Sequence, residues 1–365
     1  MNVGIVTYHR ASNYGAVFQS YALTKYINEI GHNCETIDYR SKYLEKIYGA
    51  CPTVRGVSIK EAISQIINTP IRIARKKQYS SFRNQYVPLS KVYDENNIKE
   101  TNNKYDCFVF GSDQIWNSKL NGGDLNYFGE FVENESKMNS YAASFGDYLT
   151  SLSNKERIIS LLSRFNRVGI REHQGVQVFE ELTYHEACEV LDPVFLLTKK
   201  QWESLLDKTT NKTNSGFIFI YHLKGKTTCV EKCALEISKK TGLKVINGQA
   251  LIRNNPKGII LKYSLSPLAF LSYIRDADYI VTDSFHCTAF SIIFNKKFWA
   301  LKEKGITDKE SRIGNLLLKL GLSKRLLSEI PIEFKFDIPI DYTDSCQKLE
   351  ALIQSSRDFI YTILR

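Results

Sequence analysis

The chain repeats one local pattern, in which a short apolar run ends in polar residues and is followed by a helical pattern. Apolar strands that alternate with helices favour parallel sheets covered by helices, with right-handed crossovers. The strands predicted from this pattern cover residues 3–8, 34–39, 105–110, 138–144, 167–170, 217–222, 243–246, 279–283 and 298–301. A polar stretch at 198–215 divides them into two series. The sequence therefore predicts an α/β fold with two Rossmann-like domains that face a cleft.

At 365 residues the chain is longer than one typical hydrophobic core supports, which agrees with two domains. We predict an N-terminal domain over residues 1–195, a linker over 196–215 and a C-terminal domain over 216–345. A last helix, over 346–365, is expected to pack back across the domain junction. Residues 40–104 interrupt the alternation, so we predict a helical insertion or flap there.

The net charge is +10, from 49 basic and 39 acidic residues, and the excess is spread along the chain. No nucleic-acid-binding motif accompanies it, so nucleic acid is not an expected partner. Anionic small substrates or an anionic membrane surface fit the charge at least as well. No apolar run approaches the roughly 18 residues of a membrane span, and the start lacks the features of a signal peptide. We expect a cytoplasmic protein, with peripheral association at the inner membrane face as an open alternative.

The eight cysteines are scattered, without CxxC pairs or a His/Cys cluster. This spacing predicts no metal site. Cys287, next to His286, is the one candidate nucleophile among them. Adjacent residues on a helix point about 100° apart, so the pair is not expected to form a Cys–His couple.

The stretch YIVTDSFHCTAFSIIF, residues 279–294, predicts a strand, a tight turn and a helix. Asp283 and Ser284 are residue types that cap helices, and His286 falls in the first helical turn. A helix N-terminus attracts anions, and a histidine there can hold a phosphate and exchange a proton near neutral pH. A core or capping histidine is the alternative interpretation.

The strand over 105–110 runs into GSDQIWN, residues 111–117. Glycine allows a sharp turn, and Ser112, Asp113 and Gln114 then lie at the carboxyl end of the strand, where open α/β sheets bind ligands. Carboxylate and amide groups beside an aromatic ring suit a carbohydrate. Asp113 is a candidate general base or hydroxyl ligand, with a helix cap as the alternative.

The segment Asn13-Tyr14-Gly15 follows the first strand and is a second candidate ligand site at the same edge. A single glycine is not a dinucleotide fingerprint, and an ordinary strand-to-helix turn is the alternative. Arg171 ends another strand and can grip an oxyanion with two parallel hydrogen bonds, unless Glu172 simply neutralises it.

The motifs together resemble the polysaccharide pyruvyl transferase family. The matching segments are GIVTYHRASNYGAVFQSYAL, FVFGSDQIWN with GGDLNYF, SYAASFG, RVGIREHQGVQV, LDPVFLL, DYIVTDSFHCTAFSIIFNKKF and SRIGNLL. They run in family order over about residues 3–320. The resemblance implies a fold similar to the two-domain glycosyltransferase B architecture.

The resemblance also implies a reaction. A carboxyethylidene (pyruvyl) group would pass from phosphoenolpyruvate to two hydroxyls of one sugar, forming a ketal and releasing phosphate. No cofactor or metal is expected beyond the donor substrate. The acceptor would be a sugar in a bacterial-type surface polysaccharide or its lipid-linked precursor.

Roles follow from the family positions. His286 would perform acid–base work or contact the phosphate, and Arg171 would bind the donor's anionic groups. Many relatives carry arginine two residues before the histidine, where this chain has Ser284. Ser284 would then be a neutral contact, and Arg312, a first-turn cation on a predicted helix, is a candidate substitute. The expected acceptor residues are Asn13, Tyr14, Gly15, Ser112, Asp113 and Gln114, with Asp113 as the hydroxyl base.

Two other classes stay open. One is a glycosyltransferase of the same two-domain fold that uses a nucleotide sugar. The other is a non-catalytic carbohydrate-binding relative, which the intact His286, Arg171 and Asp113 argue against.

Overall fold

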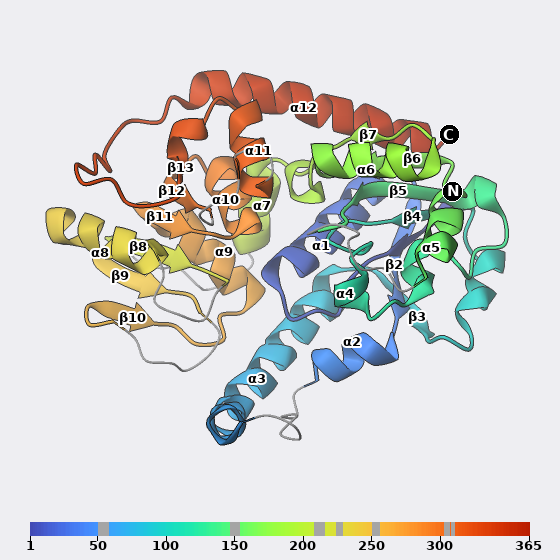
Figure 1. The fold of residues 1–365 in the computed structure, drawn as a ribbon, viewed down its shortest axis with the longest axis horizontal. Helices are drawn as coiled ribbons and strands as arrows, with labels where there is room; N and C mark the ends of the chain where they lie inside the picture. Colours follow the sequence, from blue (N-terminus) through green and yellow to red (C-terminus); the bar gives the residue numbers. More distant parts are fainter. Residues whose placement is uncertain are drawn as a thin grey trace. The chain divides into compact units, whose positions relative to one another are not determined.

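A computed structural model describes residues 1–49, 58–146, 154–207, 216–223, 229–249, 256–302, 307 and 311–365 (Figure 1). The described residues group into two compact units. The first unit comprises residues 1–49, 80–197 and 351–365, and the others form the second unit. The polar stretch predicted as a linker begins with a helix of the second unit, and residues 208–215 of it lie outside the described residues.

The first unit is built on a seven-stranded sheet in which every pairing is parallel. Its strands, in spatial order, are β3 (Leu89–Tyr93), β2 (Asn33–Tyr39), β1 (Asn2–Val6), β4 (Cys107–Phe110), β5 (Met138–Ala143), β6 (Arg167–Ile170) and β7 (Cys188–Glu189). The order runs outward from β1 in both directions. The topological switch point, where such sheets bind ligands, therefore lies between β1 and β4.

The second unit repeats this design with a six-stranded parallel sheet. The strands, in spatial order, are β10 (Ile259–Leu261), β9 (Lys244–Asn247), β8 (Phe217–Tyr221), β11 (Tyr279–Thr282), β12 (Lys297–Leu301) and β13 (Leu326–Leu327). Its switch point lies between β8 and β11. The predicted fold class, α/β with two Rossmann-like sheets, is confirmed.

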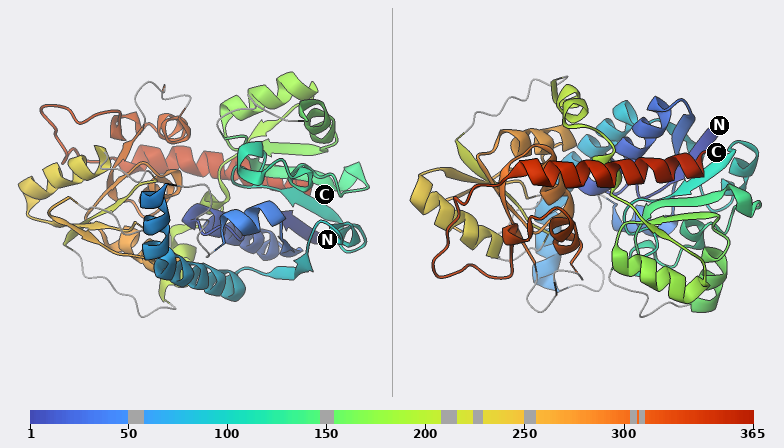
Figure 2. Two further views of the ribbon diagram at one scale, coloured as in Figure 1. Left: turned by 60° about the horizontal axis from the view of Figure 1, so that its bottom comes forward. Right: turned by 90° about the horizontal axis from the view of Figure 1, so that it is seen from above.

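Helices connect the parallel strands in both units. In the first unit, α1 and α6 lie on opposite sides of the sheet (Figure 2), because the crossovers reverse direction at the switch point. The helices there are α1 (Tyr14–Glu29), α2 (Lys42–Ile47), α4 (Ser118–Asn121), α5 (Lys155–Leu162) and α6 (His173–Thr183), with 3₁₀ turns at Ile98–Asn103, Leu125–Phe128, Glu135–Lys137 and Pro193–Phe195. Those of the second unit are α7 (Lys199–Asp207), α8 (Cys229–Thr241), α9 (Pro267–Asp276), α10 (Phe285–Ile293) and α11 (Arg312–Lys319), with a 3₁₀ turn at Ser323–Arg325.

Two long helices contribute residues to both units: α3 (Ile59–Tyr86) and α12 (Tyr342–Ile363). The helical insertion predicted over 40–104 is therefore only partly right. It contains α2 and α3, but it also supplies β3, the edge strand of the first sheet. Polar Ser90 and Lys91 interrupt the apolar residues of β3, so periodicity did not indicate a strand there.

The first core is organised around aromatic rings beneath the loop after β4. Trp116 is fully buried, and its ring centroid lies 5.1 Å from that of Phe145, 5.3 Å from that of Phe165 and 6.1 Å from that of Phe179. Such pairs add to the free energy gained by burying apolar area. The tryptophan that the sequence suggested as part of a carbohydrate platform is thus a core residue that anchors the GSDQIWN loop.

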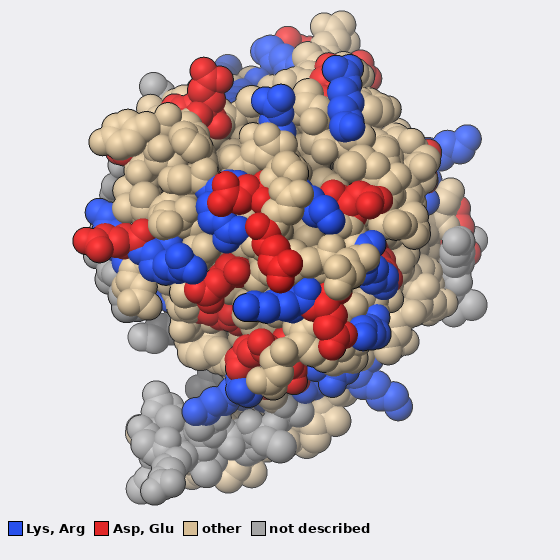
Figure 3. All heavy atoms as spheres, turned by 90° about the vertical axis from the view of Figure 1, so that its right-hand side faces the viewer, with Lys and Arg blue, Asp and Glu red and all other residues tan. Residues whose placement is uncertain are grey.

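Charged side chains of both signs are interspersed over the face drawn in Figure 3, so the basic excess does not gather there. None of the helices in the described parts of the chain is long and apolar enough to cross a membrane.

Candidate functional site

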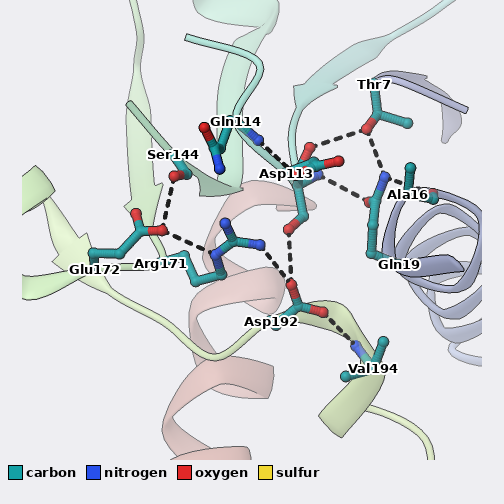
Figure 4. A network of polar contacts seen from close by, with 12 residues as sticks. Thr7, Ala16, Gln19, Asp113, Gln114, Ser144, Arg171, Glu172, Asp192 and Val194 are labelled. Atoms are coloured by element: carbon teal, nitrogen blue, oxygen red, sulfur yellow. Dashed lines mark hydrogen bonds and ion pairs between the residues drawn. The ribbon is translucent and has the colours of Figure 1, made fainter. Parts of the chain in front are cut away.

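The first candidate site is the carboxyl edge of the first sheet at its switch point, where the loops after β1 and β4 are tied together (Figure 4). The Thr7 hydroxyl donates to the Ser112 carbonyl oxygen at 3.0 Å. Gln19 of α1 donates from Nε2 to Thr7 Oγ1 at 2.7 Å and accepts from the Ser112 amide at 3.1 Å. These groups are buried, so their mutual hydrogen bonds avoid a desolvation penalty and fix the start of the GSDQIWN loop.

Arg171, directly after β6, lies below this loop and is held by two carboxylates (Figure 4). Its Nη1 is 2.9 Å from Asp192 Oδ2, and its Nε is 3.1 Å from Glu172 Oε1. The side chains of Arg171 and Asp192 are 2% and 0% exposed. Burial works against the charge of Arg171, but the carboxylates of Glu172 and Asp192 outweigh it and hold the pKa above its usual value. The alternative in which Glu172 neutralises Arg171 therefore matches the observed pairing, and donor binding by Arg171 stays a prediction.

Asp192 links this ion pair to the loop after β4. Its Oδ2 accepts from the Ser112 hydroxyl at 3.3 Å, and its Oδ1 accepts from the Val194 amide at 3.1 Å. Ser112 is fully buried, and its hydroxyl and backbone groups are bonded within the protein. This geometry favours a supporting role for Ser112 rather than direct contact with a ligand.

Asp113, Gln114 and Asn117 are the partly exposed residues of the loop. Asp113 has φ 72°, a left-handed conformation that aspartate tolerates better than most residues, and its Oδ1 accepts from the Gln114 amide at 2.9 Å. Gln114 Oε1 accepts from Asn117 Nδ2 at 2.9 Å. Gly146, with φ 65°, packs against both amide side chains, and a Cβ there would collide with them. The loop thus presents a carboxylate and amides at one edge of the sheet.

The Asn13-Tyr14-Gly15 segment begins α1. Asn13 is the N-cap, and its side-chain oxygen accepts from the amides of Gly15 at 2.8 Å and Ala16 at 3.4 Å. Asn13 is exposed, whereas Tyr14 is 2% exposed and Gly15 is buried. The geometry matches the turn-and-cap alternative for this segment, and Asn13 is its member at the surface.

The second candidate site lies at the switch point of the second sheet, where β11 leads into α10. As predicted, Ser284 is the N-cap, and its hydroxyl accepts from the Cys287 amide at 3.5 Å. The Ser284 amide donates to Thr282 Oγ1 at 3.0 Å, which fixes the turn. His286, in the first turn of α10 as predicted, is partly exposed, and its ring stands edge-on to Phe285 with centroids 5.2 Å apart. The helix dipole makes this end of α10 favourable for an anion.

The loop after β8 borders the same switch point and contains residues that the sequence did not single out. The Leu223 amide donates to Asp283 Oδ1 at 2.9 Å, which joins the loops after β8 and β11. His222 is buried. Its Nε2 lies 3.4 Å from Oε1 of Glu231 in α8 and 3.4 Å from Nδ2 of Asn247 in β9. In the sequence, only the histidine directly after the apolar run FIFIY indicates this buried polar group around His222.

Arg75 of α3 is a further cation at this edge. Its guanidinium lies beside the Tyr221 hydroxyl, where burial raises the pKa of Tyr221 to about 12 and Arg75 opposes the rise. Arg75 also stacks on Tyr79, with Cζ 5.3 Å from the ring centroid. No local pattern indicates this position for Arg75, because α3 falls in the stretch predicted only as a helical insertion or flap. Predicted Arg312 is the first helical residue of α11, which packs against α10.

Cys287 is fully buried, and desolvation raises the pKa of its thiol to about 12. The thiolate is therefore disfavoured near neutral pH, which argues against a nucleophilic role. Within the described ranges, no group of three or more His, Cys, Asp or Glu side chains is arranged to hold a metal ion.

Comparison with protein families identifies the chain. A model of the polysaccharide pyruvyl transferase family matches residues 13–304, which include every candidate site residue except Arg312. The chain belongs to this family. The resemblance drawn from the motifs is thereby confirmed, and the protein is a transferase of the pyruvyl type that acts on polysaccharide.

No curated protein matches the transferase. Solved structures similar to it include UDP-GlcNAc 2-epimerase from Neisseria meningitidis bound to UDP-GlcNAc, with 11% identity, TM-score 0.45, and coverage of 100% of this chain and 94% of the other. The Methanocaldococcus jannaschii UDP-GlcNAc 2-epimerase complex with UDP-GlcNAc and UDP has 10% identity, TM-score 0.47 and coverage of 98% and 92%. Escherichia coli heptosyltransferase WaaC with ADP has 11% identity, TM-score 0.40 and coverage of 96% and 100%.

The predicted site residues of the transferase thus fall into two groups. The first unit gathers Asn13, Ser112, Asp113, Gln114 and Arg171 along one sheet edge. The second unit places Ser284 and His286 at the start of α10 and Arg312 at the start of α11.

Proposed function

We propose that the transferase moves a carboxyethylidene group from phosphoenolpyruvate to two hydroxyls of a sugar in a surface polysaccharide or its lipid-linked precursor. The observation that carries the proposal is the position of His286. It lies in the first turn of α10, directly after the switch-point strand β11, in a chain that belongs to this family. A partly exposed histidine at a helix N-terminus combines a proton donor with a field that attracts a phosphate.

The reaction divides into two additions to one carbon. His286 donates a proton to the methylene carbon of the donor, which leaves cationic character on the carbon that bears the phosphate. A sugar hydroxyl attacks that carbon, and Asp113 takes its proton. The second hydroxyl then displaces the phosphate, and its proton leaves with the phosphate. The products are a cyclic ketal and inorganic phosphate. Asp113 then releases its proton to solvent and His286 takes one up, so the enzyme is restored and atoms and charges balance without a redox partner.

The donor carries a phosphate and a carboxylate, so its binding needs cations as well as the α10 N-terminus. We assign this role to Arg75 and Arg312, which replace the arginine that many relatives carry at the position of Ser284. Arg75 is favoured because its guanidinium stands beside Tyr221, whose strand neighbours β11. Ser284 contributes the cap that holds His286 in the first helical turn.

The acceptor is assigned to the carboxyl edge of the first sheet, with Asp113 as the base and Gln114, Asn117 and exposed Asn13 as hydroxyl ligands. Arg171 acts here as a positioning residue. Its pairing with Asp192, which also accepts from Ser112, supports the loop that carries Asp113.

The test is to incubate the protein with phosphoenolpyruvate and a panel of lipid-linked and aryl glycosides, then to measure phosphate release and product mass. Replacing two hydroxyl hydrogens with the pyruvyl group adds about 70 Da to the acceptor, so a product with this gain is expected. Phosphate release without any change in acceptor mass, or heat protection by a nucleotide sugar but not by phosphoenolpyruvate, would contradict the proposal.

A further inference from the structure

Three arginines from three different elements converge beside the candidate acceptor edge. Arg10 follows β1, Arg40 follows β2 directly, and Arg83 lies in the last turn of α3. We call them the arginine cluster. They surround Asp38, the second-last residue of β2, and none of them has a part in the proposed chemistry.

Asp38 is shared among several cationic partners. Arg10 Nη1 is 3.2 Å from Asp38 Oδ1, and Arg40 Nη2 is 4.0 Å from Asp38 Oδ2. His9 Nε2 approaches Asp38 Oδ1 at 2.9 Å. Arg10 also contacts Glu45 of α2, with Nε 2.9 Å from Oε1. One carboxylate therefore serves two guanidinium groups and a histidine, which leaves the cations incompletely balanced.

Arg83 is the member that lacks a carboxylate of its own. It is 6% exposed, and none of the ion pairs within 4.0 Å among the described residues includes it. Its Nη2 donates to the neutral Ser80 hydroxyl at 3.2 Å, and its buried Nε has no hydrogen-bond partner in the described structure. Burial and the charges of Arg10 and Arg40 lower the pKa of Arg83 to about 10, although Asp38 and Glu45 oppose the shift.

The charge balance of this group is positive. Three guanidinium groups and two carboxylates leave a net charge of +1, before His9 is counted. A buried charge without a partner costs free energy, and folded proteins offset that cost by pairing the charge. An oxyanion that accepts from Arg83 and reaches the more exposed Arg10 and Arg40 would complete the pairing, because guanidinium groups match oxyanions geometrically.

The arginine cluster lies on the edge that carries the acceptor residues. β2 and β4 flank β1 on opposite sides, so their carboxyl ends are about 10 Å apart, two strand spacings. The hydrogen bond from Thr7 to Ser112 joins the loop after β1, which also carries Arg10, to the loop after β4. An anion on the arginine cluster would thus be a short distance from a sugar beside Asp113.

We propose that the arginine cluster of Arg10, Arg40 and Arg83 binds an oxyanion carried by the acceptor glycan, either the phosphate that links the sugar to its carrier or a carboxylate on the sugar. The inference rests on the proposed function only for the identity of the ligand as the acceptor. Binding of an anionic glycan to the arginine cluster does not require pyruvyl transfer.

The test measures equilibrium binding without phosphoenolpyruvate, so its result is independent of turnover. The probes are a glycosyl diphosphate, a uronic acid glycoside, a neutral aryl glycoside of the same sugar, and inorganic pyrophosphate. Arg40→Gln is the main variant because its side chain is 44% exposed and its loss is tolerable for folding. Arg83→Gln tests the buried member. Arg157→Gln, which removes an exposed arginine paired with Glu130 in the same unit, is the matched control.

One charge-assisted hydrogen bond contributes about 1.5–3 kcal/mol, so each variant in the arginine cluster should weaken binding of an anionic glycan by about tenfold or more. Arg157→Gln should leave it unchanged, and binding of the neutral glycoside should not respond to any of the three changes. Preference for the diphosphate or for the uronic acid identifies the source of the anion.

Two results would overturn the inference. One is equal weakening of charged and neutral glycosides, which would indicate a purely structural role. The other is arginine-dependent binding of pyrophosphate that no glycoside displaces, which would assign the site to a free phosphate. If the anionic glycan binds as expected but no ketal forms, the proposed function fails and this inference stands.

Discussion

The two switch points have the same strand order and different electrostatics. At the first, Arg171, Asp192 and Ser112 form a buried chain of bonded groups beneath the loop of Asp113. At the second, His286 is partly exposed at the start of a helix. The comparison shows that one architecture carries two different kinds of polar site. In the proposed function, the buried ion pairs support the loop that binds the acceptor, and the accessible histidine at the helix N-terminus transfers a proton.

The largest effect is expected at the second switch point. His286→Asn should reduce pyruvyl transfer by roughly 10²–10⁴-fold, because general acid–base catalysis is worth about that much, while the unfolding midpoint stays unchanged. The matched control is His173→Asn, which changes an exposed histidine in the first turn of α6 in the other unit. Steady-state rates and thermal melts check both. Retention of more than about a tenth of the activity in His286→Asn would remove its chemical role.

At the first switch point, the expected effect is on stability. Asp192→Ala leaves the buried Arg171 with one partner fewer, and should lower the free energy of unfolding by about 3–5 kcal/mol. Removing Asp276, whose pair with Arg275 is more exposed, should change it by only about 0–1 kcal/mol. Urea unfolding measures both. Equal effects would show that the Arg171 pair is not the support inferred here.

The Arg171→Lys variant distinguishes two roles of Arg171, support of the loop and binding of the donor. If Arg171 binds the donor, the KM for phosphoenolpyruvate should rise, because lysine cannot reproduce a bidentate contact. If Arg171 only supports the loop, as its burial favours, the change should lower stability and leave that KM unchanged.

A smaller effect is expected for the cation supplied by α3. Arg75→Gln should raise the KM for phosphoenolpyruvate about tenfold, the value of one charge-assisted hydrogen bond, with little change in the KM for the acceptor. Lys76→Gln, at the next and exposed position, is the control. A raised KM in Arg312→Gln but not in Arg75→Gln would transfer the role to α11.

The smallest effect is expected at Asp38, on the pH dependence of the free energy of unfolding. Burial raises the pKa of this carboxyl group, but the hydrogen bond and charge of His9, with Arg10 and Arg40, lower it below the ordinary 3.8. Its contribution to stability is therefore complete above about pH 4 and is lost as pH falls through the lowered pKa. The difference in unfolding free energy between wild type and Asp38→Asn should be larger at pH 6 than at pH 3. A difference that is independent of pH would show that Asp38 is not ionised by these partners.

Sequence patterns predicted local features well and long-range pairing poorly. The apolar run before Asp283 and the cap at Ser284 placed β11 and α10 correctly, because strand, turn and cap signals are local. Only one of the two carboxylate partners of Arg171 could be predicted from the sequence. Glu172 is adjacent, whereas Asp192 is 21 residues away and meets Arg171 only in the folded sheet. Arg75 was missed for the same reason, since nothing local indicates that α3 reaches Tyr221.

The short edge strands of the second sheet also could not be predicted from apolar periodicity. β10 has three residues and β13 has two, too few to display a period. These strands complete the second sheet through pairing with β9 and β12, which depends on the rest of the fold.

The most direct test of the central claim is the mass of the acceptor after reaction with phosphoenolpyruvate in D₂O. Protonation of the donor's methylene carbon before ketal formation predicts a gain of about 70 Da for the pyruvyl group and one further mass unit for the deuterium retained in the new methyl group. His286→Asn should abolish both. An acceptor that gains a sugar instead, or a ketal without deuterium, would contradict the account.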